Sequence, residues 1–212
     1  MHREAFSMKT CGWFLWGVLY VAQVVHADVQ TFVNDYAGFV ATAGALTSID
    51  FETQPNGQPS QPGIQITASY NYDAHGVHFS APAGILELAG NPISGFHLDA
   101  IVPQPVPTSR TWIVADPLEP VLAAGGAFGG SSYLYAYDET NQLIARTYHI
   151  GGGAGHFLGI VSSTPIDYVI FDRQSYFASI GAFYFSPIPE PASAALLAVG
   201  EGWLACGRRR RI

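Results

Sequence analysis

The stretch YLYAYDETNQLIARTYH, residues 133–149, decides the fold class of this chain. Its first part alternates tyrosine with aliphatic residues, and this period of two places Tyr133, Tyr135 and Tyr137 on one face of a β-strand. Residues 138–141, Asp-Glu-Thr-Asn, have the composition of a turn. Residues 143–149 continue as a second strand, so the stretch predicts an antiparallel hairpin with a tyrosine-rich face.

Similar alternation recurs along the chain between turns rich in Gly, Pro and Asn. It predicts further strands at residues 47–52, 76–80, 85–88, 95–101, 111–114, 156–162, 168–171 and 181–185. Strands at this spacing indicate an antiparallel β-sandwich or barrel. One short helix is expected over residues 35–43, with Asn34 as its N-cap and Gly44 at its end.

The charge of residues 28–186 excludes several function classes. Thirteen acidic side chains and three arginines, with no lysine, give this part of the chain a net charge of −10. Nucleic acid and anionic lipid repel such a domain, so we expect no nucleic-acid partner. Cys11 and Cys206 lie outside this range, which excludes a disulfide, a cysteine-based zinc site and a cysteine nucleophile within it.

The N-terminal segment has the pattern of a signal peptide. Arg3 and Lys9 precede an apolar segment at residues 11–25, and Val-His-Ala at residues 25–27 is a small-x-small cleavage site. We therefore expect a signal peptide at residues 1–27, cut between Ala27 and Asp28. Met1 and Met8 are alternative starts, and an uncleaved membrane helix is the alternative interpretation of the segment.

The C-terminal segment, residues 187–212, reads as a membrane anchor. Pro189-Glu190-Pro191 is followed by an apolar run at residues 192–206 and by four arginines. Arginine resists transfer across a bilayer, so the arginine cluster is expected to stop translocation on the cytoplasmic side. The cluster consists of Arg208, Arg209, Arg210 and Arg211.

This order of features resembles the PEP-CTERM sorting signal of bacterial surface proteins. The resemblance implies an exosortase-type membrane protease as partner, which would process the chain near Pro189-Glu190-Pro191. It also implies a precursor held in the inner membrane by its C-terminal helix, followed by release to the cell surface or beyond. Glu201 departs from the pattern, because an acidic residue near mid-membrane opposes insertion by about 2.5–3.5 kcal/mol.

The body of the chain resembles the jelly-roll, galactose-binding-like sandwiches found in PEP-CTERM proteins. The resemblance is carried by Ile49-Asp50-Phe51-Glu52, residues 76–80, Phe157-Leu158-Gly159-Ile160 and residues 164–169. It implies a two-sheet sandwich associated with carbohydrate or an extracellular matrix.

Some members of that sandwich class hold a structural calcium ion between acids of the first and last strands. Glu52 matches the first position, and Asp50 is a further weak candidate. The last strand of this chain reads Ile180-Gly181-Ala182-Phe183, where acids are expected. Calcium takes six to eight oxygen ligands, and the alternative is that Asp50 and Glu52 form a solvated face of one strand.

The sequence contains no pattern that assigns catalytic residues. We expect a non-catalytic, exported surface or matrix protein associated with exopolysaccharide, in which aromatic side chains stack on sugars or, alternatively, belong to the core. The candidates are Trp112, Tyr133, Tyr135 and Tyr137. The alternative function is an extracellular hydrolase of glycans or esters, which requires a concave pocket with converging acids or histidines.

Overall fold

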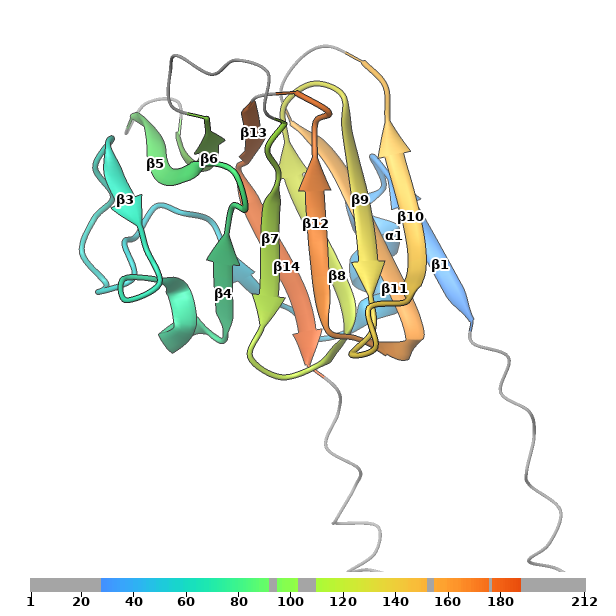
Figure 1. Ribbon diagram of the computed structural model, residues 1–212. Coiled ribbons are helices and arrows are strands. Elements are labelled where there is room, and N and C mark those ends of the chain that lie inside the picture. The colour runs from blue at the N-terminus through green and yellow to red at the C-terminus, as the bar shows by residue number, and fades with distance from the viewer. Residues whose placement is uncertain (1–27, 92–94, 103–109, 152–154, 176, 188–212) are drawn as a thin grey trace, which may run out of the picture.

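The computed structural model describes residues 28–91, 95–102, 110–151, 155–175 and 177–187 (Figure 1). Within these residues, fourteen strands form three antiparallel sheets, accompanied by one α-helix and a short 3-10 helix, η1, at Tyr72–His75. The predicted β-rich, sandwich-like fold with one α-helix is confirmed.

The first sheet has the strand order β1-β11-β8-β14-β2. Its strands are β1 (Val29–Val33), β11 (His156–Ile166), β8 (Val121–Phe128), β14 (Ala182–Pro187) and β2 (Thr47–Ile49). The second sheet has the order β10-β9-β12-β7-β4 and contains the hairpin predicted at residues 133–149. Its strands are β10 (Leu143–His149), β9 (Ser132–Tyr137), β12 (Tyr168–Asp172), β7 (Ile113–Pro117) and β4 (Val77–Ser80).

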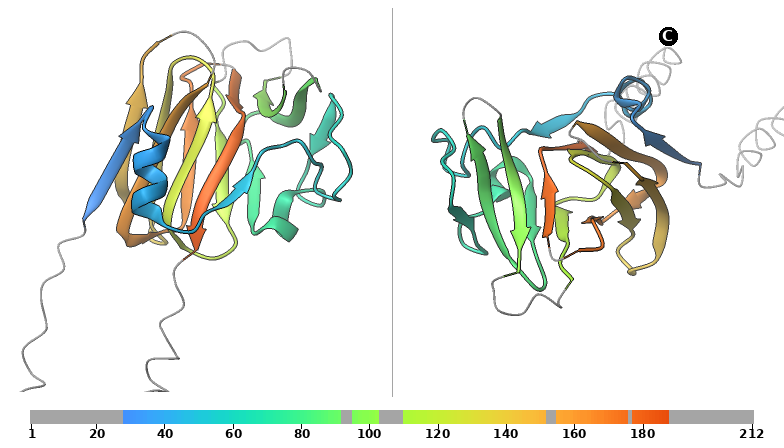
Figure 2. Two further views of the ribbon diagram at one scale, coloured as in Figure 1. Left: turned by 180° about the vertical axis from the view of Figure 1, so that it is seen from behind. Right: turned by 90° about the horizontal axis from the view of Figure 1, so that it is seen from above.

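These two sheets pack face to face around a continuous apolar core (Figures 1 and 2). The second sheet contributes Leu134 and Phe171, and the first contributes Leu158 and Phe183, all of them buried. Burying such side chains stabilises the fold by roughly 1.5–3 kcal/mol each. The alternation in β9 follows from this packing, because one face of each strand turns to the core and the other to solvent.

The third sheet has the order β13-β6-β5-β3 and lies beside the other two. Its strands are β13 (Phe177–Ile180), β6 (Gly95–Ile101), β5 (Ile85–Asn91) and β3 (Ile64–Ile66). Leu88 and Leu98 from this sheet are fully buried and belong to the same core as the sandwich. The resemblance implied two sheets; the structure adds this third one because the core extends past the sandwich edge.

Helix α1 (Tyr36–Ala43) covers the outer face of the first sheet (Figure 2). Its buried Phe39 packs tilted against Phe157 of β11, with ring centroids 5.1 Å apart. The N-cap is Asp35, whose Oδ1 accepts from the Gly38 N–H at 2.9 Å, so the prediction of Asn34 as the cap was wrong. Asn34 instead has a positive φ of 55° and binds the backbone of Phe157. Gly44 ends the helix as predicted.

The strand expected at residues 47–52 is shorter than predicted. β2 ends at Ile49, and the next segment departs from strand geometry because buried Phe51 has a φ of 61°. The side-chain alternation therefore stops, and the prediction that Asp50 and Glu52 share one strand face was wrong. Packing of the Phe51 ring against Tyr72 and Phe79 accompanies this backbone conformation.

Candidate functional site

The outer face of the second sheet is rich in tyrosine. In β9, Leu134 and Ala136 are buried, whereas Tyr133, Tyr135 and Tyr137 alternate with them and are half-buried on the opposite face. They therefore lie outside the core, on the face of the second sheet that is turned toward the viewer in Figure 1.

The neighbouring strands add two more tyrosines to this face. Cross-strand pairing sets Tyr148 of β10 opposite Tyr133, and Tyr168 of β12 opposite Tyr137. Tyr148 is 54% exposed. Sequence analysis did not single out these two residues, although Tyr148 lies on a strand predicted from the same stretch and register alone brings it to the face.

The five rings form two parallel groups, which we call the upper and lower tyrosine stacks. In the upper stack, the Tyr133 ring lies 6.0 Å from Tyr135 and 5.6 Å from Tyr148, with interplanar angles of 16° and 28°. In the lower stack, Tyr137 and Tyr168 lie 4.9 Å apart at 11°. Parallel packing against a neighbour restricts each ring, so the stacks present a preorganised aromatic surface.

The phenol groups of these stacks are polar. Burial raises the pKa of both Tyr135 and Tyr168 above the usual tyrosine value. The Tyr168 hydroxyl donates to Asn141 Oδ1 at 3.0 Å, in the turn between β9 and β10. The face therefore combines ring surfaces with hydroxyl groups that donate and accept hydrogen bonds.

Charged groups border the upper stack. Asp172 lies opposite Tyr133 and forms a two-pronged ion pair with Arg110, in which Arg110 Nε donates to Asp172 Oδ1 at 3.2 Å. Arg146 lies opposite Tyr135 and is exposed. The Asp172 side chain is only 9% exposed, so the ion pair holds a nearly buried carboxylate in place beside Tyr133.

Trp112 is half-buried and lies directly before β7. Among the described residues, no ring contact joins it to the tyrosine stacks. The structure thus brings three of the four predicted aromatic residues together and leaves the fourth apart from them.

A cavity of about 460 Å³ lies elsewhere, between the first and third sheets. Asp50, Glu52 and His97 line it, together with Phe96 and Phe128. Glu52 Oε1 accepts from the Phe96 N–H at 3.1 Å, and Asp50 Oδ1 accepts from the Glu52 N–H at 3.0 Å. The two weak calcium candidates therefore meet at one cavity, each with an oxygen already bound by a backbone donor.

His97 has an acidic neighbour on its own strand. Its Nε2 lies 3.5 Å from Oδ1 of Asp99, which is buried. Interaction with this carboxylate raises the pKa of His97 above its usual value, and burial opposes the change to a smaller degree. Within the described part of the chain, no group of three or more His, Cys, Asp or Glu side chains is arranged to hold a metal ion.

The predicted terminal signals lie outside the described residues. These are the signal peptide with its cut after Ala27, the Pro189-Glu190-Pro191 motif and the arginines at 208–211. The described residues include no helix of the length and apolarity needed to cross a membrane.

Comparison with known proteins gives weak similarity. No family model matches the chain, and no curated protein matches its sequence. Among solved structures, a mutant lectin-binding domain of lectinolysin complexed with Lewis b is 12% identical, with a TM-score of 0.32, over 43% of this chain and 72% of that one. The family 32 carbohydrate-binding module of C. perfringens NanJ, complexed with galactose, is 11% identical, with a TM-score of 0.35, over 51% and 92%.

An arabinose-bound α-L-arabinofuranosidase, MgGH51, is also similar, at 11% identity and a TM-score of 0.37. The match covers 69% of this chain but only 27% of that enzyme. We draw neither a ligand nor an activity from similarities this low.

Proposed function

We propose that this protein is an exported, non-catalytic module that binds polysaccharide through the tyrosine face of its second sheet. The observation that carries the proposal is the pair of parallel tyrosine stacks on an open sheet face. Contiguous apolar patches on a protein surface often mark the site where a partner binds.

The shape and chemistry of the face suit an extended sugar polymer. The two stacks follow a row of strands spaced about 4.8 Å apart, so the surface is broad and not a closed pocket. The apolar C–H faces of sugar rings pack on aromatic rings, and the phenol hydroxyls bind sugar hydroxyls. Because a surface site leaves much of the ligand in water, we expect micromolar-to-millimolar affinity, about 4–8 kcal/mol of binding free energy.

We further propose that the terminal segments deliver the module to the cell envelope. Residues 1–27 would direct export, and residues 187–212 would hold the precursor in the inner membrane until an exosortase-type protease processes it near Glu190. The resemblance of Pro189-Glu190-Pro191 and the arginine cluster to the PEP-CTERM signal supports this route. A module delivered by this route would meet the exopolysaccharides of the cell envelope.

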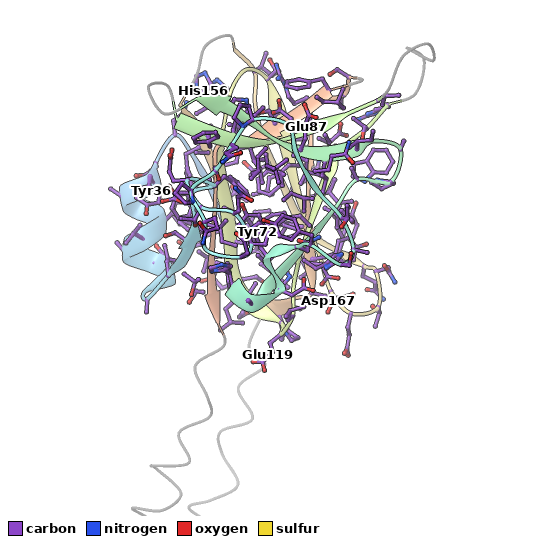
Figure 3. The ribbon with its side chains drawn as sticks, turned by 90° about the vertical axis from the view of Figure 1, so that its left-hand side faces the viewer. Tyr36, Tyr72, Glu87, Glu119, His156 and Asp167 are labelled. Carbon is purple, nitrogen blue, oxygen red and sulfur yellow. The ribbon has the colours of Figure 1, made fainter. Side chains whose placement is uncertain are left out.

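Affinity electrophoresis of the full-length protein in gels containing soluble polysaccharides tests the binding proposal. The substitutions Tyr133→Ala and Tyr135→Ala should restore free mobility in a gel that retards the wild type. Tyr36→Ala is the matched control, because Tyr36 is an exposed tyrosine on helix α1, on the other side of the molecule (Figure 3). Two results would overturn the proposal. Either no polysaccharide retards the wild type, or the two single variants and the double variant are all retarded as strongly as the wild type.

A second candidate function is favoured by the cavity that Asp50, Glu52 and His97 line. Two carboxylates and an imidazole converge there, as a hydrolase of glycans or esters requires. Both carboxylates are exposed, however, whereas a carboxyl general acid depends on an apolar, water-poor environment. Hydrolysis by the wild type that Glu52→Gln abolishes would identify an enzyme; we expect no turnover from either protein.

A further inference from the structure

Basic side chains are scarce in the described part of the chain, and their positions are therefore informative. Residues 28–187 contain three arginines, Arg110, Arg146 and Arg173, and no lysine, against thirteen acids. Two of the three arginines lie at the upper tyrosine stack. A domain with so acidic a balance has little general attraction for anions, so a local basic group on an open face decides what that face attracts.

Arg110 and Arg146 differ in whether their charge is already paired with an acid. Arg110 is neutralised by its two-pronged ion pair with Asp172. Arg146 is exposed, and within the described residues it forms no ion pair. Among the described residues, its guanidinium is therefore the basic group of the face that has no ion-pair partner and is open to a ligand.

Arg146 lies beside the rings of the upper stack, on β10, the edge strand of the second sheet. It is directly opposite Tyr135, and Tyr148, two residues further along β10, is opposite Tyr133. Opposite residues have Cβ atoms about 5 Å apart. A sugar ring held by Tyr133 and Tyr135 would therefore carry its substituents within reach of the Arg146 guanidinium, whose planar fork matches a carboxylate.

The lower stack has the opposite electrostatic surroundings. Burial is the main cause of the raised pKa of the Tyr168 phenol, and the nearby Asp167 and Asp138 carboxylates add to it. The upper half of the tyrosine face thus carries Arg146 beside the paired Arg110 and Asp172, and the lower half lies beside two acids. An acidic sugar unit is attracted to the upper stack and repelled by the lower one.

We propose that the ligand of the upper tyrosine stack is an acidic polysaccharide with carboxylate-bearing sugar units, and that Arg146 binds the carboxylate. This inference rests on the proposed function, since it specifies the chemical class of the polysaccharide. The bound carboxylate replaces water on an exposed guanidinium, while the ring of the same sugar packs on Tyr133 and Tyr135.

Polygalacturonate and its methyl ester, two polymers with the same backbone, provide the test. The full-length protein should bind the free acid about tenfold more tightly than the ester, the difference expected for one charge-assisted contact of roughly 1.4 kcal/mol. Arg146→Gln should remove this preference. Arg173→Gln removes the same charge away from the face, where the guanidinium lies over the Phe177 ring, and should keep the preference.

The outcomes separate this inference from the proposed function. Equal wild-type binding to acid and ester, or equal losses in the Arg146→Gln and Arg173→Gln variants, would overturn the carboxylate assignment while glycan binding by the tyrosines stands. Failure to bind either polymer or any neutral polysaccharide would overturn both. Arg146→Lys keeps the charge without the fork and should retain part of the preference, and thermal melts should show that each variant is folded.

Discussion

At the scale of single residues, Asn71 shows how this fold closes an exposed strand edge. β4 is the last strand of the second sheet, so one side of it has no neighbouring strand. The buried Asn71 side chain takes that place: its Nδ2 donates to the Phe79 carbonyl at 2.7 Å, and its Oδ1 accepts from the Phe79 N–H at 2.8 Å. The amide thus imitates one peptide group of a missing strand and blocks edge-to-edge association.

We therefore expect Asn71→Ala to destabilise the protein strongly. The change leaves the buried N–H and C=O groups of Phe79 without their partner, and each unsatisfied buried group costs about 1–3 kcal/mol. Urea denaturation should show a loss of roughly 2–4 kcal/mol in unfolding free energy. Asn56→Ala is the control, because Asn56 is an exposed turn residue; equal stability of the two variants would contradict this role for Asn71.

Individual residues also show where sequence reasoning was accurate. Period-two alternation predicted that Tyr133, Tyr135 and Tyr137 share a face, because β9 is a regular strand with one buried side. The same reasoning was wrong for Asp50 and Glu52, since Phe51 adopts a positive φ that its sequence does not indicate. Tertiary packing imposes that conformation, so local pattern carries no signal of it.

At the scale of elements, β8 is the most important strand that was not predicted from the sequence. It lies at the centre of the first sheet, between β11 and β14, and is buried on both faces. Its sequence, VLAAGGAF, lacks alternation and includes two glycines, so no strand was predicted there. Glycine is needed here because the neighbouring strand leaves no room for a side chain. A Cβ at Gly125 would lie 2.8 Å from the Leu158 carbonyl oxygen.

Gly126→Ala tests this spatial requirement. A Cβ at Gly126 would lie 2.7 Å from the Phe171 ring and 3.0 Å from the Ala182 carbonyl oxygen, so the two sheets must separate or Phe171 must move. We expect overpacking to reduce the unfolding free energy by about 1–3 kcal/mol. Gly181→Ala is matched to it, because its Cβ would meet nothing nearer than an ordinary contact at 3.7 Å. If the melting temperature of Gly126→Ala equals or exceeds that of Gly181→Ala, this account is contradicted.

Some element boundaries followed the sequence closely, whereas β5 and β11 run further than predicted and β7 is shifted along the chain. β6 and β10 begin and end as predicted, and Asn141, with a φ of 62°, forms the expected turn between β9 and β10. Short strands such as β3 were not predicted, because three residues give too little alternation to detect. Their existence depends on pairing with β5, a contact between segments distant in the chain.

At the scale of the whole molecule, the two ends of the described chain lie together. β1 begins and β14 ends at the same end of the molecule (Figure 1). Figure 3 shows Glu119 and Asp167 at this end too, and the pairing of Asp167 with the Tyr137 carbonyl brings the lower tyrosine stack toward it. The upper stack, with Arg146, is therefore the half of the face further from the point where the chain continues to residue 212.

This arrangement gives the proposed anchoring a geometrical consequence. A precursor held by residues 187–212 would turn its acidic end toward the anionic membrane surface and its upper tyrosine stack away from it. Repulsion between the acids and the lipid headgroups would keep the face accessible while the chain is anchored. Sequence alone could not reveal this, because the charges that share one end come from turns far apart in the chain.

The proposed sorting route makes the last prediction. In a host with an exosortase-type protease, Glu190→Ala should leave the full-length precursor in the membrane fraction, because the motif for processing is incomplete while the apolar run and arginines still hold the chain. Glu119→Ala removes an equal charge from an exposed turn and should be released normally. Cell fractionation with mass measurement of the released chain distinguishes these cases. Release of Glu190→Ala at the wild-type mass would rule out processing at the motif.

Glu201→Leu should hold its precursor in the membrane more firmly than the wild type, since it removes an insertion cost of about 2.5–3.5 kcal/mol.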